Sequence, residues 1–301
     1  MTARKPYRIN KYLRWILVMI MISECQSIAE IDNIEFEPAM VMNFIMSDDP
    51  LYSFSHIKLY SEKSILDNTE EAQPISGASL ELFENSRKVA DAEEINIGVY
   101  KFDYTPKANK TYLIKGHKEG YEDIYSEDIS PSKTSTIAIK ELTPFPKDNF
   151  ARKRTYRLTY LLDDSHEKNY YDLQLYVRYS DGTRHTLQSI RTRQIGVAIE
   201  LGMIGDTTRV FTDDLFNGER HLAILEFDLE NRDNQKSRKT ELILNLKHTS
   251  EAYYNYYRSL ESQANAQENP FTEPAQVFSN IQNGYGIFAV YLSDSTVLPI
   301  K

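Results

Sequence analysis

Cysteine is almost absent from this chain of 301 residues, which contains a single one, Cys25. One thiol excludes any disulfide within the chain, so the fold must be stabilised by the burial of apolar side chains. The chain is long enough for two ordinary domains, each with its own core. The lone cysteine therefore needs an explanation other than a cross-link.

Basic residues are also in deficit. Lys and Arg number 35 against 44 Asp and Glu, a formal net charge of −9 at pH 7. The first 24 residues have the opposite balance, with five basic side chains and one acidic one, so the remainder is more acidic still. An acidic chain without a basic stripe repels phosphate backbones, and nucleic acid is not an expected partner.

Catalytic motifs are missing as well. The six histidines are scattered, with no His-x-His or His-Glu-x-x-His spacing for zinc, at His56, His117, His166, His185, His221 and His248. There is no Gly-x-Ser-x-Gly elbow and no phosphate-binding loop. We therefore expect no enzyme activity, no metal site and no cofactor.

Three pairs of adjacent carboxylates are the exception. Asp48–Asp49, Asp163–Asp164 and Asp213–Asp214 all lie next to turn residues. Such pairs can supply oxygen ligands for Ca²⁺ or paired carboxylates for glycoside hydrolysis, but either role requires convergence in space. The default interpretation is solvated turn carboxylates, and a hydrolase that uses these pairs is the third of three hypotheses.

The N-terminus lacks a hydrophobic run long enough to cross a membrane. The uncharged run Trp15–Ile22 follows the basic segment and is too short for a helix to span a hydrocarbon core of about 30 Å. A basic region followed by a short apolar region is typical of a secretory signal. Because Cys25 stands directly after it, we expect residues 1–24 to be a lipoprotein signal peptide and Cys25 to carry the lipid. Glu24 departs from the small residue usual before that cysteine.

What the chain has in abundance is tyrosine, with 21 residues. Hydrophobic residues make up 41% and charged residues 26%, which are the values of a globular protein. Tyrosine suits a half-buried pleated surface and favours β structure.

The first half of the mature chain reads as short strands separated by turns. After a tether at 25–38, we expect strands at 40–46, 52–60, 80–83, 98–104 and 111–115. No helical period persists before residue 145. Two prolines in the segment 142–148 indicate a boundary, so residues 39–143 are expected to form an N-terminal β-sandwich.

The second half, 149–301, is expected to be a β-rich domain that carries one helix. Alternation predicts strands at 155–161, 170–179, 194–201, 220–229, 240–247 and 287–290. Thr249–Ser250 can cap a helix near 250–264, where Tyr253, Tyr257 and Leu260 recur at helical spacing. The sequence therefore predicts an all-β protein with one or two helices.

The C-terminal segment resembles a known family. Asn269–Pro274 and Val277–Phe288 strongly resemble the DUF4249 family of Bacteroidota, and Phe211–Gly218 and Tyr253–Leu260 are similar to other signature segments of it. The resemblance implies an outer-membrane lipoprotein with an immunoglobulin- or transthyretin-like N-terminal sandwich. Members are often encoded beside TonB-dependent receptors, and the family has no established catalytic residues to transfer.

Two functions in addition to the hydrolase stay open. In the first, the chain is a non-catalytic accessory subunit of a TonB-dependent transporter or another outer-membrane β-barrel, anchored by lipid and exposed at the cell surface or facing the periplasm. In the alternative, it is an extracellular glycan- or peptide-binding lipoprotein for nutrient capture, with loops at the sandwich ends as the site. Candidate surface residues for a partner or ligand are Tyr170, Tyr171, Asp213, Asp214, Phe271, Asn280 and Asn283.

Overall fold

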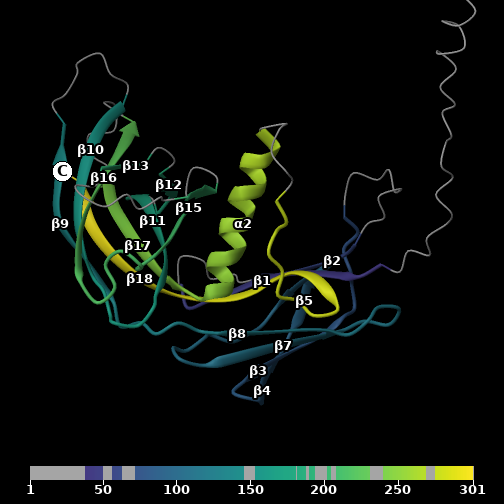
Figure 1. The fold of residues 1–301 in the computed structure, drawn as a ribbon. Helices are drawn as coiled ribbons and strands as arrows, with labels where there is room; N and C mark the ends of the chain where they lie inside the picture. The colour runs from purple at the N-terminus through teal and green to yellow at the C-terminus, as the bar shows by residue number, and fades with distance from the viewer. Residues whose placement is uncertain are drawn as a thin grey trace, which may run out of the picture. The chain divides into compact units, whose positions relative to one another are not determined.

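A sheet of ten strands runs through the computed structural model of this chain (Figure 1). The structure describes residues 38–49, 56–62, 72–145, 153–180, 182–187, 190–193, 202–204, 208–230, 240–268 and 275–300. The strands of the long sheet are β14 (Gly202–Ile204), β15 (Thr208–Thr212), β11 (Tyr170–Tyr179), β17 (Thr240–Thr249), β18 (Gly284–Ile300), β1 (Met40–Ser47), β2 (His56–Ser61), β6 (Val99–Lys101) and β5 (Glu93–Asn96) in spatial order, with β12 (Arg184–Thr186) paired to β11.

Two four-stranded sheets accompany the long sheet. The first, which we call the small sheet, has the order β4 (Arg87–Asp91), β3 (Ser79–Glu84), β7 (Thr111–His117) and β8 (Ile124–Ile129). The second has the order β13 (Ile190–Arg193), β16 (Arg220–Glu230), β10 (Lys153–Asp163) and β9 (Thr136–Pro144). Most neighbouring strands are antiparallel, and the pair β1–β18 is parallel.

One face of the long sheet packs against both smaller sheets. Side chains alternate between the two faces of a strand, so every second residue of each long strand points into these cores. Phe44 of β1 stacks on Phe288 of β18 with ring centroids 5.6 Å apart, in the core shared with the small sheet. Further along the same face, Leu244 of β17 and Leu173 of β11 pack against Leu158 of β10 in the second core. The long sheet is thus half of two β-sandwiches.

The opposite face of the long sheet carries the helix α2 (Glu251–Glu268), as Figure 1 shows. Ser250 caps it, since its Oγ accepts a hydrogen bond from the Tyr253 backbone N–H at 3.2 Å. Tyr253 is buried with Ile287 and Tyr291 of β18. β18 is therefore covered on both sides, by the small sheet and by the helix. No helix in the described part of the chain combines the length and apolar composition that crossing a bilayer requires.

The prediction of an all-β protein with one helix is confirmed for the described residues. The expected strands at 40–46, 155–161 and 240–247 and the helix near 250–264 all form. The expected strand at 194–201 lies outside the described residues.

The predicted boundary at 142–148 begins at the end of β9. β9 pairs with β10 and β1 pairs with β18, so strands from the two predicted domains share sheets. The division into domains at 39–143 and 149–301 stays a prediction about folding units.

Gly286 is required where β18 meets β1, and this yields a testable prediction. Its φ is +108°, and an added Cβ would lie 2.1 Å from the carbonyl oxygen of Met42. Gly120 has a similar φ of +87°, but nothing lies within 4 Å of its would-be Cβ. We expect Gly120→Ala to cost about 1 kcal/mol of unfolding free energy for the left-handed backbone alone. Gly286→Ala should cost at least about 3 kcal/mol, because backbone atoms must also move. If urea unfolding showed equal losses of unfolding free energy for the two variants, the backbone at the β1–β18 contact could move aside at little cost.

Candidate functional site

The outer face of the small sheet, which points away from the core, carries an unusual set of side chains on β8. Ile124, Ser126 and Asp128 point inward and are buried. Tyr125 and Ile129 point outward and are 48% and 62% exposed. This strand therefore places polar groups inside and an exposed aromatic ring on the surface, the reverse of the usual alternation.

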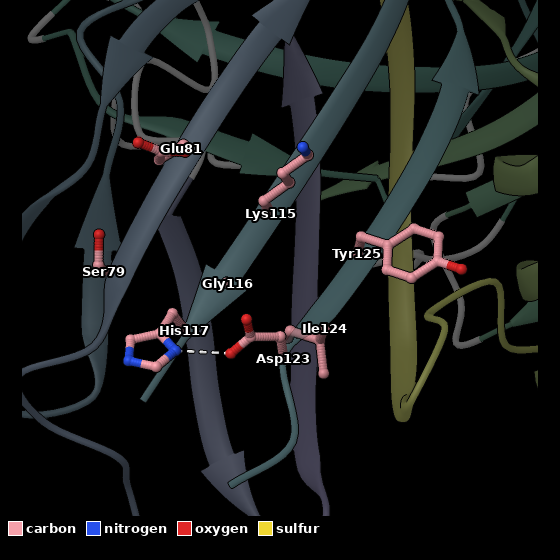
Figure 2. A pocket seen from close by; sticks show the side chains of 8 residues that line it. All are labelled: Ser79, Glu81, Lys115, Gly116, His117, Asp123, Ile124 and Tyr125. Carbon is pink, nitrogen blue, oxygen red and sulfur yellow. Dashed lines mark hydrogen bonds and ion pairs between the residues drawn. The ribbon is translucent and has the colours of Figure 1, made fainter. Parts of the chain in front are cut away.

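A hollow of about 310 Å³ lies on this face (Figure 2). Its lining residues come from β3, β7 and the start of β8: Ser79, Glu81, Lys115, Gly116, His117, Asp123, Ile124 and Tyr125. The imidazole of His117 faces the carboxylate of Asp123, with Nδ1 2.6 Å from Oδ1. Both side chains are mostly exposed, so this ion pair contributes little to stability.

A second hollow of about 700 Å³ adjoins the first and shares Lys115 and Tyr125 with it. It is lined by Leu113, Lys115, Tyr125, Ser126, Glu127, Asn280 and Gln282. We call the two hollows together the β7–β8 groove. Its far wall is formed by Asn280 and Gln282, which precede β18 in the chain.

Hydrogen bonds fix that wall to β8. The backbone N–H of Gln282 donates to the carbonyl of Tyr125 at 2.8 Å, and the N–H of Tyr125 donates back at 3.4 Å. The Ser126 hydroxyl donates to the carbonyl of Asn280 at 2.9 Å. The backbone of Tyr125 is therefore paired on both sides, with Lys115 of β7 and with Gln282, and this fixes the position of the groove wall.

Charges of both signs surround the groove. The ammonium of Lys115 lies 5.0 Å from the ring centroid of Phe83. Glu81 is bridged by Lys88, whose Nζ is 2.6 Å from Oε1. Glu127 is exposed on β8. The groove thus combines hydrogen-bond donors and acceptors without an excess of positive charge.

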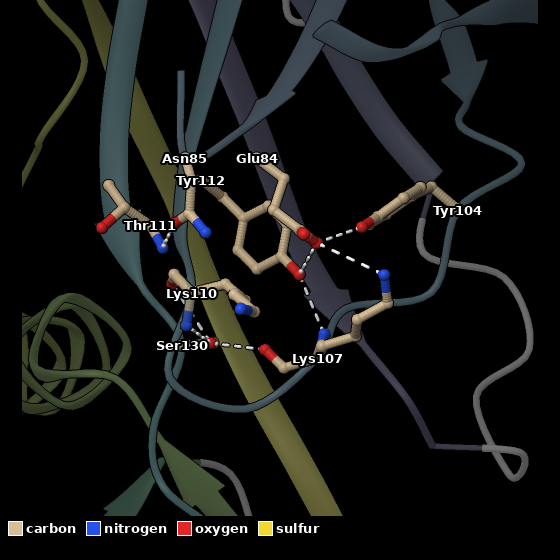
Figure 3. Close-up of polar contacts among 8 residues, drawn as sticks. All are labelled: Glu84, Asn85, Tyr104, Lys107, Lys110, Thr111, Tyr112 and Ser130. Atoms are coloured by element: carbon tan, nitrogen blue, oxygen red, sulfur yellow. Dashed lines mark hydrogen bonds and ion pairs between the residues drawn. The ribbon is translucent and has the colours of Figure 1, made fainter. Parts of the chain in front are cut away.

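A separate polar cluster secures the turn before β7 (Figure 3). The Glu84 carboxylate accepts hydrogen bonds from the hydroxyls of Tyr104 and Tyr112, and Lys107 Nζ lies 3.8 Å away. The Tyr104 hydrogen bond holds the pKa of Glu84 below its usual range, and burial raises the pKa of Tyr104. The Tyr112 hydroxyl accepts from the backbone N–H of Lys107, the tyrosine corner that immunoglobulin-like sandwiches use. Because both tyrosine hydroxyls donate to the Glu84 carboxylate, this cluster serves to fix the structure of the turn.

Comparison with known families decides the identity of the chain. The sequence profile described as "Domain of unknown function (DUF4249)" matches residues 28–296, which is nearly the whole chain. The chain belongs to the DUF4249 family. No curated protein matches it.

Two of the predicted surface residues of this DUF4249 chain lie at the groove. The side-chain amide of Asn280 donates to the carbonyl of Phe288 at 2.8 Å and accepts from its N–H at 2.9 Å. Asn283, with a φ of +59°, donates to the carbonyl of Asp123 at 3.0 Å. Both amides therefore serve the backbone of the groove wall, and their roles in ligand contact stay predictions.

Tyr170 and Asp214 lie away from the groove. The Tyr170 ring is 5.2 Å from that of Tyr254 on the helix. Asp214 accepts a hydrogen bond from the Thr212 hydroxyl at 2.7 Å and lies 3.5 Å from Lys168 Nζ. These exposed or half-buried groups belong to the surface near the N-terminus of the helix.

Tyr171 and Asp213 are buried instead of forming a surface. The Tyr171 hydroxyl donates to Asp164 and lies 2.7 Å from the Ser135 hydroxyl oxygen. Asp213 accepts from the backbone N–H of Asn169 at 2.7 Å, and burial raises the pKa of its carboxyl. Neither can contact a partner directly in this arrangement.

The acidic pairs are only partly the solvated turn carboxylates expected from the sequence. One member of each pair is buried: Asp49, Asp164 and Asp213. Asn169 joins two of them, because its side-chain amide lies 3.5 Å from Asp164 and 3.3 Å from Asp213. Asp213 Oδ1 is buried and has no hydrogen-bond partner among the described residues. No group of three potential metal ligands occurs in that part of the chain. Cys25 and Phe271 lie outside the described residues.

Sequence reasoning missed Asp128, which joins three elements. Its carboxylate accepts a hydrogen bond from the Val290 N–H at 2.8 Å and one from the hydroxyl of Ser250, the helix cap. β17 pairs with β18 only from Tyr291 onward, so Asp128 and Asn280 satisfy backbone groups that β17 leaves unpaired. Burial raises the pKa of Asp128 to about 7.

It also missed a buried ion pair beneath the helix. Lys247 Nζ lies 3.1 Å from Asp172 Oδ2, and the Tyr253 hydroxyl donates to the same oxygen at 2.7 Å. Asp172 and Lys247 are direct partners across β11 and β17. The pair fixes Tyr253, and so the helix, on the long sheet.

Asp128 gives the protein a pH dependence with a definite sign. A carboxyl whose pKa is raised on folding contributes stability that is full below its unfolded pKa and is lost as pH rises through about 7. Asp128→Asn cannot ionise, so its unfolding free energy should improve relative to the wild type by a few kcal/mol between pH 4 and pH 8. Chemical unfolding at both pH values measures the difference. A pH-independent offset between the two proteins would refute the assignment.

His248 should make stability depend on pH in the opposite direction to Asp128, so that stability falls as the pH falls. Both of its ring nitrogens are buried, neither has a hydrogen-bond partner among the described residues, and burial lowers the pKa of His248 to about 4. The stability that depends on the neutral ring is full above pH 6.5 and is lost as pH falls through about 4. His248→Leu should raise the unfolding free energy by about 1–2 kcal/mol at pH 7 and by more at pH 4.5. A variant that loses stability at both pH values would contradict this.

Proposed function

We propose that this DUF4249 protein is a non-catalytic outer-membrane lipoprotein, anchored through Cys25, that serves as an accessory subunit of a TonB-dependent transporter or another outer-membrane β-barrel. The signal-like N-terminus and the single cysteine support export and lipid anchoring. The accessory role is supported by one surface of the second four-stranded sheet.

That surface is an apolar row across three strands, which we define as Ala138, Leu161 and Leu222. Leu161 of β10 is the direct partner of Ala138 on β9 and of Leu222 on β16. On β10, Leu158, Tyr160 and Leu162 face the core, so Leu161 and its two cross-strand partners face outward. Leu222 is 59% exposed.

We take this row as the contact surface, because apolar side chains on an outer sheet face gain free energy when a protein partner covers them. An outer-membrane β-barrel exposes extracellular loops and periplasmic turns outside the bilayer, and side chains of these segments can cover the row. The binding energy would then come from side-chain burial, and no catalytic group is needed.

Co-purification tests the proposal with the full-length chain in the cell that encodes it. The tagged wild type should carry an outer-membrane β-barrel protein through detergent solubilisation, and mass spectrometry should find Cys25 acylated. Leu222→Asp should reduce the co-purified barrel at least about tenfold, because it places a charge in the row.

Val297→Asp is the matched control. Val297 is an exposed apolar residue of β18 at 45%, outside the row, and its substitution should leave the barrel in place. Isolation of a lone monomer with a free Cys25 thiol would refute both the anchoring and the accessory role.

A further inference from the structure

Tyr125 is the feature that the proposed function does not use. Its ring is 48% exposed at the centre of the β7–β8 groove, where the two hollows meet. Its backbone pairs with Lys115 of β7 on one side and with Gln282 on the other. The ring is therefore an aromatic platform on a fixed backbone, which loses little conformational entropy when a ligand covers it.

We propose that the β7–β8 groove binds a neutral glycan, with Tyr125 stacked against a sugar ring. A pyranose presents one face of C–H groups, which suits an aromatic ring, and a rim of hydroxyls that both donate and accept hydrogen bonds. The groove supplies acceptors from Glu81 and Glu127, an amide from Gln282 and a donor from Lys115.

The dimensions agree with this ligand class. Hollows of about 310 and 700 Å³ lie within the range of roughly 300–1,000 Å³ for sites that hold small molecules. Because the two adjoin at Lys115 and Tyr125, an oligosaccharide can extend from the His117–Asp123 end to the wall at Gln282. A monosaccharide would cover only Tyr125.

Charge argues against an anionic ligand. Lys88 pairs with Glu81 and His117 pairs with Asp123, so the remaining charges of the lining, Lys115 and Glu127, leave no excess of positive charge for an anion. The chain as a whole carries a net charge of −9. Phosphorylated or acidic ligands would be repelled.

Backbone pairing argues against a peptide that adds as a strand. Such a peptide needs the unpaired edge of β8, but Gln282 already occupies that edge at Tyr125 with two hydrogen bonds. The open surface is the face of the sheet, where side chains and not backbone groups make the contacts.

Affinity electrophoresis of the purified mature chain through gels that contain starch, xylan or mannan tests the proposal. At least one of these neutral polysaccharides should retard the wild type, and Tyr125→Ala should weaken that binding at least about tenfold. Glu127→Gln should weaken it too, since one acceptor becomes partly a donor. Tyr285→Ala is the control, because Tyr285 is 51% exposed and does not line the groove.

Three results would overturn the proposal: no retardation by any neutral polysaccharide, retardation by the anionic polysaccharide alginate alone, or equal binding by Tyr125→Ala and the wild type. The barrel co-purification described above should survive Tyr125→Ala. If that variant loses the barrel instead, the groove is a protein interface and the glycan assignment is wrong. The two proposals therefore fail separately.

Discussion

The parallel pairing of β1 with β18 is the constraint on which the remaining structure depends. It joins the first described strand to the last one along the whole of β1, from Met40 opposite Gly284 to Ser47 opposite Tyr291. The two strands bury one face against the small sheet and the other against the helix. Asn280 and Gln282 directly precede β18 in the chain, and they bond to Ser126 and Tyr125 of β8, so the strand that pairs with β1 also places this side of the groove.

Buried polar groups fix these elements in one arrangement. Asp128 links β8 to β18 and to the helix cap, Asp172 and Lys247 hold Tyr253 from below, and Asn169 joins Asp164 to Asp213. Apolar packing alone would be more tolerant of sliding between sheets. Polar networks of this kind add little net stability, but each displacement leaves a buried charge or donor unpaired. We infer that they specify the register of the three sheets.

Local patterns in the sequence were enough to predict the all-β class, the strand at 40–46 and the capped helix, because period-two alternation and Ser250 act within a few residues. β8 escaped prediction for a physical reason. Ser126 and Asp128 face inward to bond Asn280 and Val290, while Tyr125 and Ile129 face water, so its hydrophobic pattern is inverted. The groove could not be predicted, since β8 and Gln282 meet only through tertiary pairing. Asn280 is predicted as a surface residue for a partner or ligand, and the structure shows that its amide also bonds to the backbone of Phe288.

The pairing of β1 with β18 also sets when the long sheet can be completed during synthesis. β18 follows every other described strand in the chain, so this edge of β1 stays open until β18 has been made. Contacts so distant in sequence form slowly. During that interval, exposed strand edges invite aggregation unless a chaperone shields them. A premature stop before residue 284 would remove β18 and divide the long sheet between β17 and β1.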